Sequence, residues 1–263
     1  MISAFTLFML YAAGAWLMLR SVRKPRLESF AWVVILVAII GHSDAIMQHM
    51  MRKGPFSIGL FEAMSLLGWT LAVLACLISI DKQFRVLGAI LILSAAVGAA
   101  LTDAGRSFAE ATSGGWELTA HILLSMAAAA LLFAAAVTAL LLVFLESRLR
   151  KRRLADLPSA LPPLDALEKV MFRLIAAGFG LLTLALLTGF VFVTNLFTQN
   201  LVQKTVLSLV AWLLFGVLLI GRLRFGWRGR SAVRWTLFGF GILALAYFGV
   251  KFVLEYLFGR HWG

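Results

Sequence analysis

Two histidines, His42 and His121, lie inside long apolar stretches of this sequence, His42 toward the end of one stretch and His121 near the start of another. An ionisable side chain in bilayer hydrocarbon is costly and usually faces the interior of a helix bundle, so each histidine is a candidate site residue. A neutral imidazole can donate a ring nitrogen to iron, and two facing imidazoles can hold a haem between them. The chemistry that this pair supports best is therefore bis-histidine ligation of one haem.

Further polar residues reach the same level of the predicted helices. Since each helical residue advances about 1.5 Å, the membrane-embedded polar side chains within about two turns of one boundary are His42, Glu62, His121, Lys204, Lys251 and Glu255. Lys204 or Lys251 could neutralise the anionic propionates of a haem. An arrangement of two haems needs histidine pairs on single helices, so with two buried histidines at most one haem fits. A transmembrane electron wire is thereby excluded.

Simpler interpretations of the same residues stay open. A lone membrane histidine often makes a helix-to-helix hydrogen bond, and Lys204 could extend its amine to the headgroups. Glu62 could serve only as a partner for Lys251. His49 is predicted to be solvent-accessible, as is the histidine near the C-terminus, and neither is given a role.

The elements that must position these residues are membrane-spanning helices. The 263 residues are 62% hydrophobic and 14% charged, which is far more apolar than a soluble domain. Apolar stretches long enough to cross a bilayer as helices occur at about 2–19, 29–47, 58–80, 86–102, 118–145, 172–196, 205–221 and 235–257. The composition predicts an all-α, polytopic helical bundle of about eight transmembrane helices, with residues 1–263 forming a single integral membrane domain in contact with the lipid bilayer.

The net charge of +12 does not indicate nucleic acid as a partner, because the basic residues lie between the spans and not on one soluble face. Of the 24 lysines and arginines, 18 lie in the first, third, fifth and seventh connections and only 4 in the second, fourth and sixth. The positive-inside rule then predicts that both termini lie on the outer, periplasmic side. The single cysteine, Cys76, lies within a span and predicts no disulfide, redox pair or thiolate metal site.

Four segments carry a resemblance to a known family. They are Trp116–Ser125 (WELTAHILLS), Lys204–Trp212 (KTVLSLVAW), Gly226–Arg230 (GWRGR) and Tyr247–Leu254 (YFGVKFVL). In order and spacing, from about residue 58 to residue 257, the chain resembles the cytochrome c assembly protein family. This is the haem-handling superfamily of the CcsA and CcmC proteins, and the resemblance is closest to its eight-span, inner-membrane branch of YpjD and HemX-like proteins.

The resemblance implies a haem-binding protein of the bacterial inner membrane, concerned with cytochrome c biogenesis or haem handling, with haem b as the expected cofactor. It places His42 and His121 at the positions of membrane histidines of the family, and other cytochrome c maturation or membrane proteins are its expected partners. Two departures matter. The tryptophan-rich segment of the synthase members is absent before Lys204, and Gln203 stands where related eight-span members often have histidine. We therefore expect no cytochrome c synthase activity.

Two other functions stay open at this point. The outer polar residues could form the vestibule of a transporter or exporter component for a small anionic solute, or they could tie helices together in a structural or regulatory membrane partner. The sequence contains no nucleophilic triad, phosphate-binding loop or metal-spaced cluster that would indicate an enzyme.

Overall fold

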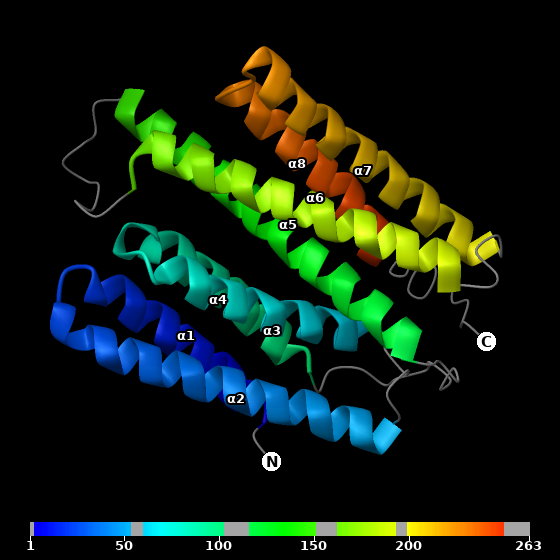
Figure 1. The fold of residues 1–263 in the computed structure, drawn as a ribbon. Coiled ribbons are helices and arrows are strands. Elements are labelled where there is room, and N and C mark those ends of the chain that lie inside the picture. The colour runs from blue at the N-terminus through cyan, green and yellow to red at the C-terminus, as the bar shows by residue number, and fades with distance from the viewer. Residues whose placement is uncertain (1–2, 54–59, 103–115, 151–161, 193–198, 250–263) are drawn as a thin grey trace. The chain divides into compact units, whose positions relative to one another are not determined.

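All the secondary structure in the described part of the chain is helical. The computed structural model describes residues 3–53, 60–102, 116–150, 162–192 and 199–249 (Figure 1). The eight α-helices are α1 (Ala4–Ser21), α2 (Glu28–Lys53), α3 (Leu60–Ser79), α4 (Arg85–Ala100), α5 (Trp116–Arg150), α6 (Leu164–Phe192), α7 (Gln199–Phe225) and α8 (Arg230–Ala244). A π-helical turn, Leu245–Gly249, continues α8, and short 3-10 turns, Pro25–Leu27 and Lys82–Phe84, precede α2 and α4. The predicted all-α class is confirmed.

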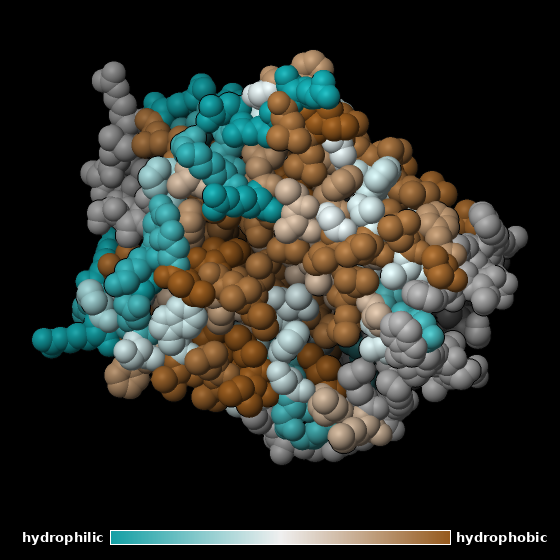
Figure 2. Space-filling view, viewed as in Figure 1, coloured by the Kyte–Doolittle hydropathy of each residue, from teal (hydrophilic) through white to brown (hydrophobic). Residues whose placement is uncertain are grey.

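The helices have the length and composition of membrane spans. Within the described residues, seven helices, α1 to α7, are long and apolar enough to cross a bilayer. Many large apolar side chains on them are exposed, as expected of surfaces that face lipid. Figure 2 shows many apolar side chains exposed at the surface. The chain is a multi-pass membrane protein, while the side on which its termini lie stays a prediction.

The chain divides into two compact units. The first comprises residues 1–107 and 145–164, and the second comprises residues 108–144 and 165–263. That residues 1–263 form a single domain stays a prediction. In the first unit α1 packs against α2 and α4, and α3 packs against α4. Gly68 and Gly98 bring α3 and α4 together, because a Cβ added to Gly68 would lie 2.9 Å from the Gly98 Cα.

Aromatic side chains join the helices of the second unit. The Trp212 indole of α7 stacks on Phe179 of α6, with ring centroids 5.5 Å apart, and donates to Thr183 Oγ1 at 2.8 Å. Phe133 of α5 meets Phe240 of α8 edge-on at 5.5 Å. These contacts connect α5 with α8 and α6 with α7, and they hold in place the helix surfaces that carry the site residues of this unit.

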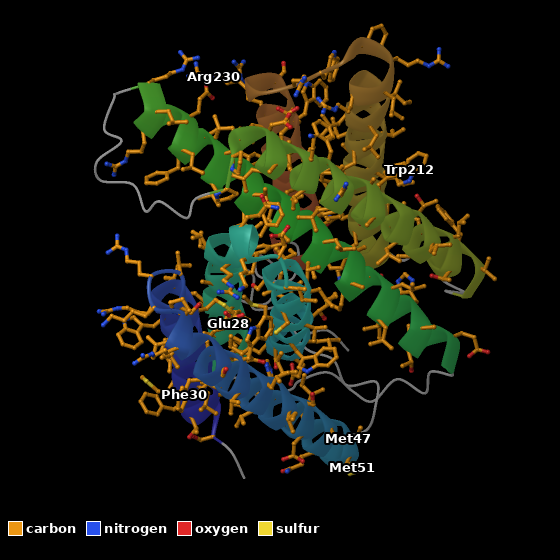
Figure 3. All side chains as sticks on the ribbon, turned by 60° about the vertical axis from the view of Figure 1, so that its left-hand side comes forward. Glu28, Phe30, Met47, Met51, Trp212 and Arg230 are labelled. Atoms are coloured by element: carbon orange, nitrogen blue, oxygen red, sulfur yellow. The ribbon has the colours of Figure 1, made fainter. Side chains whose placement is uncertain are left out.

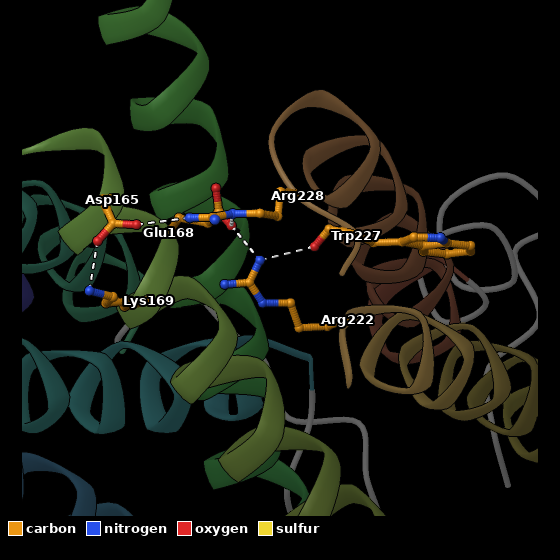
Figure 4. Close-up of polar contacts among 6 residues, drawn as sticks. All are labelled: Asp165, Glu168, Lys169, Arg222, Trp227 and Arg228. Atoms are coloured by element: carbon orange, nitrogen blue, oxygen red, sulfur yellow. Dashed lines mark hydrogen bonds and ion pairs between the residues drawn. The ribbon is translucent and has the colours of Figure 1, made fainter. Parts of the chain in front are cut away.

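The connection between α7 and α8 is fixed by charge (Figure 4). Gly226 ends α7 with φ of 65°, a left-handed conformation that glycine adopts without strain. The Glu168 carboxylate of α6 accepts from Arg222 Nη1 at 2.7 Å and from Arg228 Nε at 3.2 Å, and Arg228 also pairs with Asp165 at 2.9 Å. Arg222 in turn donates to the Trp227 carbonyl. These ion pairs attach the α7–α8 connection to the start of α6.

Candidate functional site

His42 lies in the second half of α2 and is fully buried, with no exposed side-chain surface. Its Nδ1 lies 3.3 Å from the Tyr11 hydroxyl of α1, and its Nε2 lies 2.9 Å from the Ser65 hydroxyl of α3. Ser65 Oγ is in turn 3.0 Å from Thr102 Oγ1, whose hydroxyl donates to the Ala99 carbonyl at 2.8 Å. The imidazole is thus one member of a hydrogen-bonded chain that joins α1, α2, α3 and the end of α4.

One set of directions satisfies every group in this chain, with the Thr102 hydroxyl as its starting point. A hydroxyl has one proton to donate, and the Thr102 proton points at the Ala99 carbonyl. Ser65 must then donate to Thr102, which leaves the Ser65 oxygen to accept from His42 Nε2–H. The lone pair of His42 is consequently on Nδ1, where it accepts from the Tyr11 hydroxyl. This set of directions corresponds to a neutral His42 that is protonated on Nε2.

His121 lies in the second turn of α5 and is half-buried. Its Nδ1 is 3.1 Å from Thr188 Oγ1 of α6. The Thr188 hydroxyl directs its own proton at backbone carbonyls of α6, Leu184 at 3.0 Å and Ala185 at 2.9 Å. With its proton directed in this way, Thr188 accepts from the imidazole, which corresponds to a His121 with its proton on Nδ1 and its lone pair on Nε2.

The ring nitrogens of the two histidines differ in the hydrogen bonds that a metal ion would encounter. Ligating histidines usually donate the ring N–H that faces away from the metal to a fixed acceptor, and His121 has this arrangement toward Thr188. At His42 the nitrogen with the lone pair already accepts from Tyr11. Within the described residues no group of three or more His, Cys, Asp or Glu side chains is placed to hold a metal ion. A single imidazole such as that of His121 is compatible with an iron that a porphyrin already holds.

Gly189 shapes the surroundings of His121. A Cβ added to this glycine would lie 3.1 Å from Cε1 of the imidazole, so the ring packs directly on the α6 backbone one residue beyond Thr188. Lys204 lies in the second turn of α7 and is half-buried. Lys251 and Glu255 lie outside the described residues. The structure thus joins His42 to Tyr11 and Ser65, and His121 to Thr188 and Gly189, while the predicted pairing of His42 with His121 stays a prediction.

A second polar pair at the same end of α2 was not predicted. His49 Nε2 lies 3.3 Å from Glu62 Oε1 of α3, with 22% and 11% of the two side chains exposed. Figure 3 marks this end of α2 by Met47 and Met51, with Glu28 at the other end. His42 and His49 are seven residues apart, about two helical turns, and so lie on one face of α2. This face contacts α3 through Ser65 and Glu62.

The comparisons place the chain among known proteins. Residues 57–258 match the family model of the cytochrome C assembly protein. The chain belongs to the cytochrome c assembly protein family. It is similar to the inner membrane protein YpjD of Escherichia coli K12, with 42% identity over 146 residues, which are 56% of this chain and 54% of YpjD.

Other members of the family are more distant. A 28.8 kDa protein of Azospirillum brasilense is 36% identical over 170 residues, which cover 62% of each chain. The cytochrome c biogenesis protein CcsA of Synechococcus elongatus is 31% identical over 107 residues, which are 40% of this chain and 33% of CcsA. The matches therefore span about half to two thirds of the length of the first relatives. No solved structure matches the present chain.

These similarities agree with the helical architecture. The family assignment and the YpjD match identify the chain as an inner-membrane protein of the cytochrome c assembly family. The matched residues 57–258 include α3 to α8 and so contain Ser65, His121, Thr188 and Lys204, whereas Tyr11 and His42 precede them. The His121 surroundings therefore lie wholly in the part of the chain that defines the family.

Proposed function

We propose that this protein binds one haem in the course of cytochrome c biogenesis or haem handling, with His121 as an axial ligand through Nε2. The observation that supports this most strongly is the 3.1 Å contact of His121 Nδ1 with Thr188 Oγ1, because an Nδ1–H donated to Thr188 would leave the lone pair on Nε2 for iron. Haem, when bound, supplies an iron that can change its oxidation state. The protein's task is to orient the imidazole and to exclude water from it.

Thr188 and Gly189 perform this orientation. The hydrogen bond fixes the rotation of the ring, and the missing Cβ of Gly189 lets the ring lie against α6. Outer hydrogen bonds of this kind raise the basicity of a ligating imidazole, and their loss typically lowers metal affinity about 10- to 100-fold.

We propose His42 as the second axial ligand and Lys204 as the residue that neutralises a haem propionate. His42 must first give up the 3.3 Å contact with the Tyr11 hydroxyl, since this contact occupies its Nδ1 lone pair. A neutral hydrogen bond of this kind contributes about 0.5–1.5 kcal/mol, so the loss of this contact is a small cost. The Nε2–H bond to Ser65 would persist and would then hold the ligating ring.

Absorption spectroscopy of the purified full-length protein, oxidised and reduced, tests the proposal. We expect a haem Soret band that His121→Ala abolishes, while His42→Ala converts a six-coordinate, low-spin spectrum into a five-coordinate one. His49→Ala is the matched control, because it removes a histidine of the same helix that pairs with Glu62, and it should leave the spectrum unchanged. A colourless protein that takes up no added haem, or a His121→Ala spectrum identical to that of the wild type, would refute haem ligation.

The hydrogen bonds of His42 favour one competing role, that of a structural tie. Both of its ring nitrogens already meet hydroxyl groups, on α1 and on α3, as in a polar contact whose only task is to join helices. If this is its whole role, His42→Ala should lower the stability of the protein and leave its haem content and spin state unchanged. The same spectra therefore separate the two roles of His42.

A further inference from the structure

The end of α1 and the connection to α2 carry a dense group of exposed cations. Its members, which we call the basic turn, are Arg20, Arg23, Lys24 and Arg26. The backbone N–H groups of Arg23 and Lys24 both donate to the Arg20 carbonyl, at 3.1 and 2.9 Å, so the chain turns tightly at this point. Pro25 then begins a short 3-10 helix. The backbone thus holds four cations together at one end of the first unit.

Among the described residues, no acidic side chain pairs with the basic turn. Glu28, labelled in Figure 3, is the only acidic residue of α1, the connection and the first half of α2. Its carboxylate is already paired with Arg85 of α4, which is 4% exposed. Asp81, between α3 and α4, accepts instead from Gln83. Like charges this close together repel, so an anion that the basic turn shares would stabilise this end of the unit.

Trp16 holds Arg20 in position. The guanidinium carbon of Arg20 lies 4.7 Å from the centroid of the indole ring, and Trp16 is 54% exposed one turn earlier on the same face of α1. Stacking of this kind uses the flat face of the guanidinium and leaves the N–H groups around its edge available as donors. Arg20 also lies in the last turn of α1, where the helix dipole favours a cation. The stacked guanidinium is therefore a preorganised donor for an oxyanion.

An exposed stripe continues from Arg20 along α1. Its members are spaced three or four residues apart, and so share one helix face, and they are Trp16, Ala13, Met9 and Phe5. The opposite face is buried, through Leu7, Tyr11, Gly14 and Met18. From Arg20 to Met9 the stripe extends about 16 Å, at about 1.5 Å per residue, which is close to half of a hydrocarbon layer about 30 Å thick. One acyl chain can lie along a stripe of this length.

We propose that the basic turn and the α1 stripe together bind one anionic phospholipid. Arg20 and Arg23, three residues apart, hold its phosphate, because guanidinium groups match phosphate oxygens in charge and in fork geometry. The other two cations attract the headgroup over a longer range. One acyl chain runs along α1 past Trp16 toward Met9. Free phosphate would satisfy the cations alone and leave the stripe unused, so a lipid is the more complementary ligand.

Binding of defined lipids to the full-length protein in a neutral detergent tests this proposal. Native mass spectrometry would compare long-chain phosphatidylglycerol with phosphatidylcholine of the same acyl chains. We expect tighter binding of phosphatidylglycerol, and R20Q/R23Q should weaken it about tenfold or more, since each basic residue near an anionic headgroup contributes substantially. The matched control is R224Q/R234Q, which removes the same charge from exposed positions of α7 and α8 and should have little effect. Equal losses in the two double variants, or equal affinity for the two lipids, would overturn the site.

Two further arms use the unaltered chain and so do not depend on the folding of a variant. Phosphatidylglycerol with a photoreactive group on one acyl chain should crosslink to α1 between Met9 and Trp16, as mapped by peptide mass spectrometry. Inorganic phosphate at concentrations that match the lipid should not compete. Crosslinks spread evenly over the exposed helix faces would refute the α1 stripe, and effective competition by phosphate would show that the basic turn binds the anion without the lipid chain.

Discussion

Replacing Ser65 by alanine tests the directed hydrogen-bond chain around His42. Ser65 is 2% exposed and His42 is fully buried, so water cannot reach this point to supply a substitute acceptor. The substitution leaves the His42 Nε2–H without its acceptor, while Thr102 keeps its own donation to the Ala99 carbonyl. One buried donor is therefore left unsatisfied.

The expected loss of stability follows from this single unsatisfied donor. A buried donor left without a partner costs about 1–3 kcal/mol, and polar contacts between membrane helices reach at most about 1.7 kcal/mol, so we expect Ser65→Ala to cost about 1–2 kcal/mol. Tyr11→Phe should cost about 1 kcal/mol, because the contact that it removes is longer, at 3.3 Å. Thr102→Ala should cost least, since the Ser65 hydroxyl can turn to a carbonyl of its own helix.

Unfolding of the detergent-solubilised protein by sodium dodecyl sulfate, followed by the fluorescence of its 8 tryptophans, measures this order. Ser94→Ala is the control, because the Ser94 hydroxyl bonds only to the Ile90 carbonyl of its own helix, at 3.0 Å, and its loss should be nearly neutral. Nitrogen NMR of labelled histidine should find His42 protonated at Nε2. A Thr102→Ala protein as unstable as Ser65→Ala, or a proton on Nδ1, would refute the assigned directions.

Four further substitutions test the packing and the site. Thr188→Val removes the acceptor of the His121 Nδ1–H and should weaken haem binding about tenfold, measured by haem titration. Gly68→Ala places a Cβ 2.9 Å from backbone and should cost about 1–3 kcal/mol in detergent unfolding, whereas Gly180→Ala, with nothing within 4 Å, should be neutral or slightly stabilising. Glu168→Ala releases two arginines from a carboxylate that is 11% exposed and should cost about 1–3 kcal/mol in the same assay.

The apolar stretches predict the helices well and their ends less well. The sixth predicted span begins at residue 172, whereas α6 begins at Leu164. Asp165, Glu168 and Lys169 lower the hydropathy of this first part, and a hydropathy argument treats them as a connection. In the structure Glu168 is buried, because arginines that follow much later in the chain neutralise it. Hydropathy within one segment cannot register charges that a distant segment satisfies.

Residue types identify the candidate site better than they identify its contacts. His42 and His121 were selected because imidazoles are unusual in apolar segments, and the structure buries the first fully and the second in part. Their partners Tyr11, Ser65 and Thr188 are ordinary residues of membrane helices, and only the packing of particular helices brings them to the imidazoles. The 3.3 Å contact of His49 Nε2 with Glu62 Oε1 likewise depends on how α2 and α3 pack, whereas Lys251, the partner that the sequence suggests for Glu62, lies outside the described residues.

The difference between the two histidines leads to a prediction with opposite signs for stability and for haem binding. Tyr11→Phe removes the hydroxyl that occupies the Nδ1 lone pair of His42, so it should weaken the fold by about 1 kcal/mol. The same change should strengthen haem binding by up to about tenfold and raise the six-coordinate fraction, because His42 no longer has to break a bond before it ligates. Ser65→Ala should instead weaken both, since it removes the bond that orients the ring. If Tyr11→Phe lowers stability and leaves the haem spectrum and affinity unchanged, His42 is a structural tie and the second axial ligand is another residue.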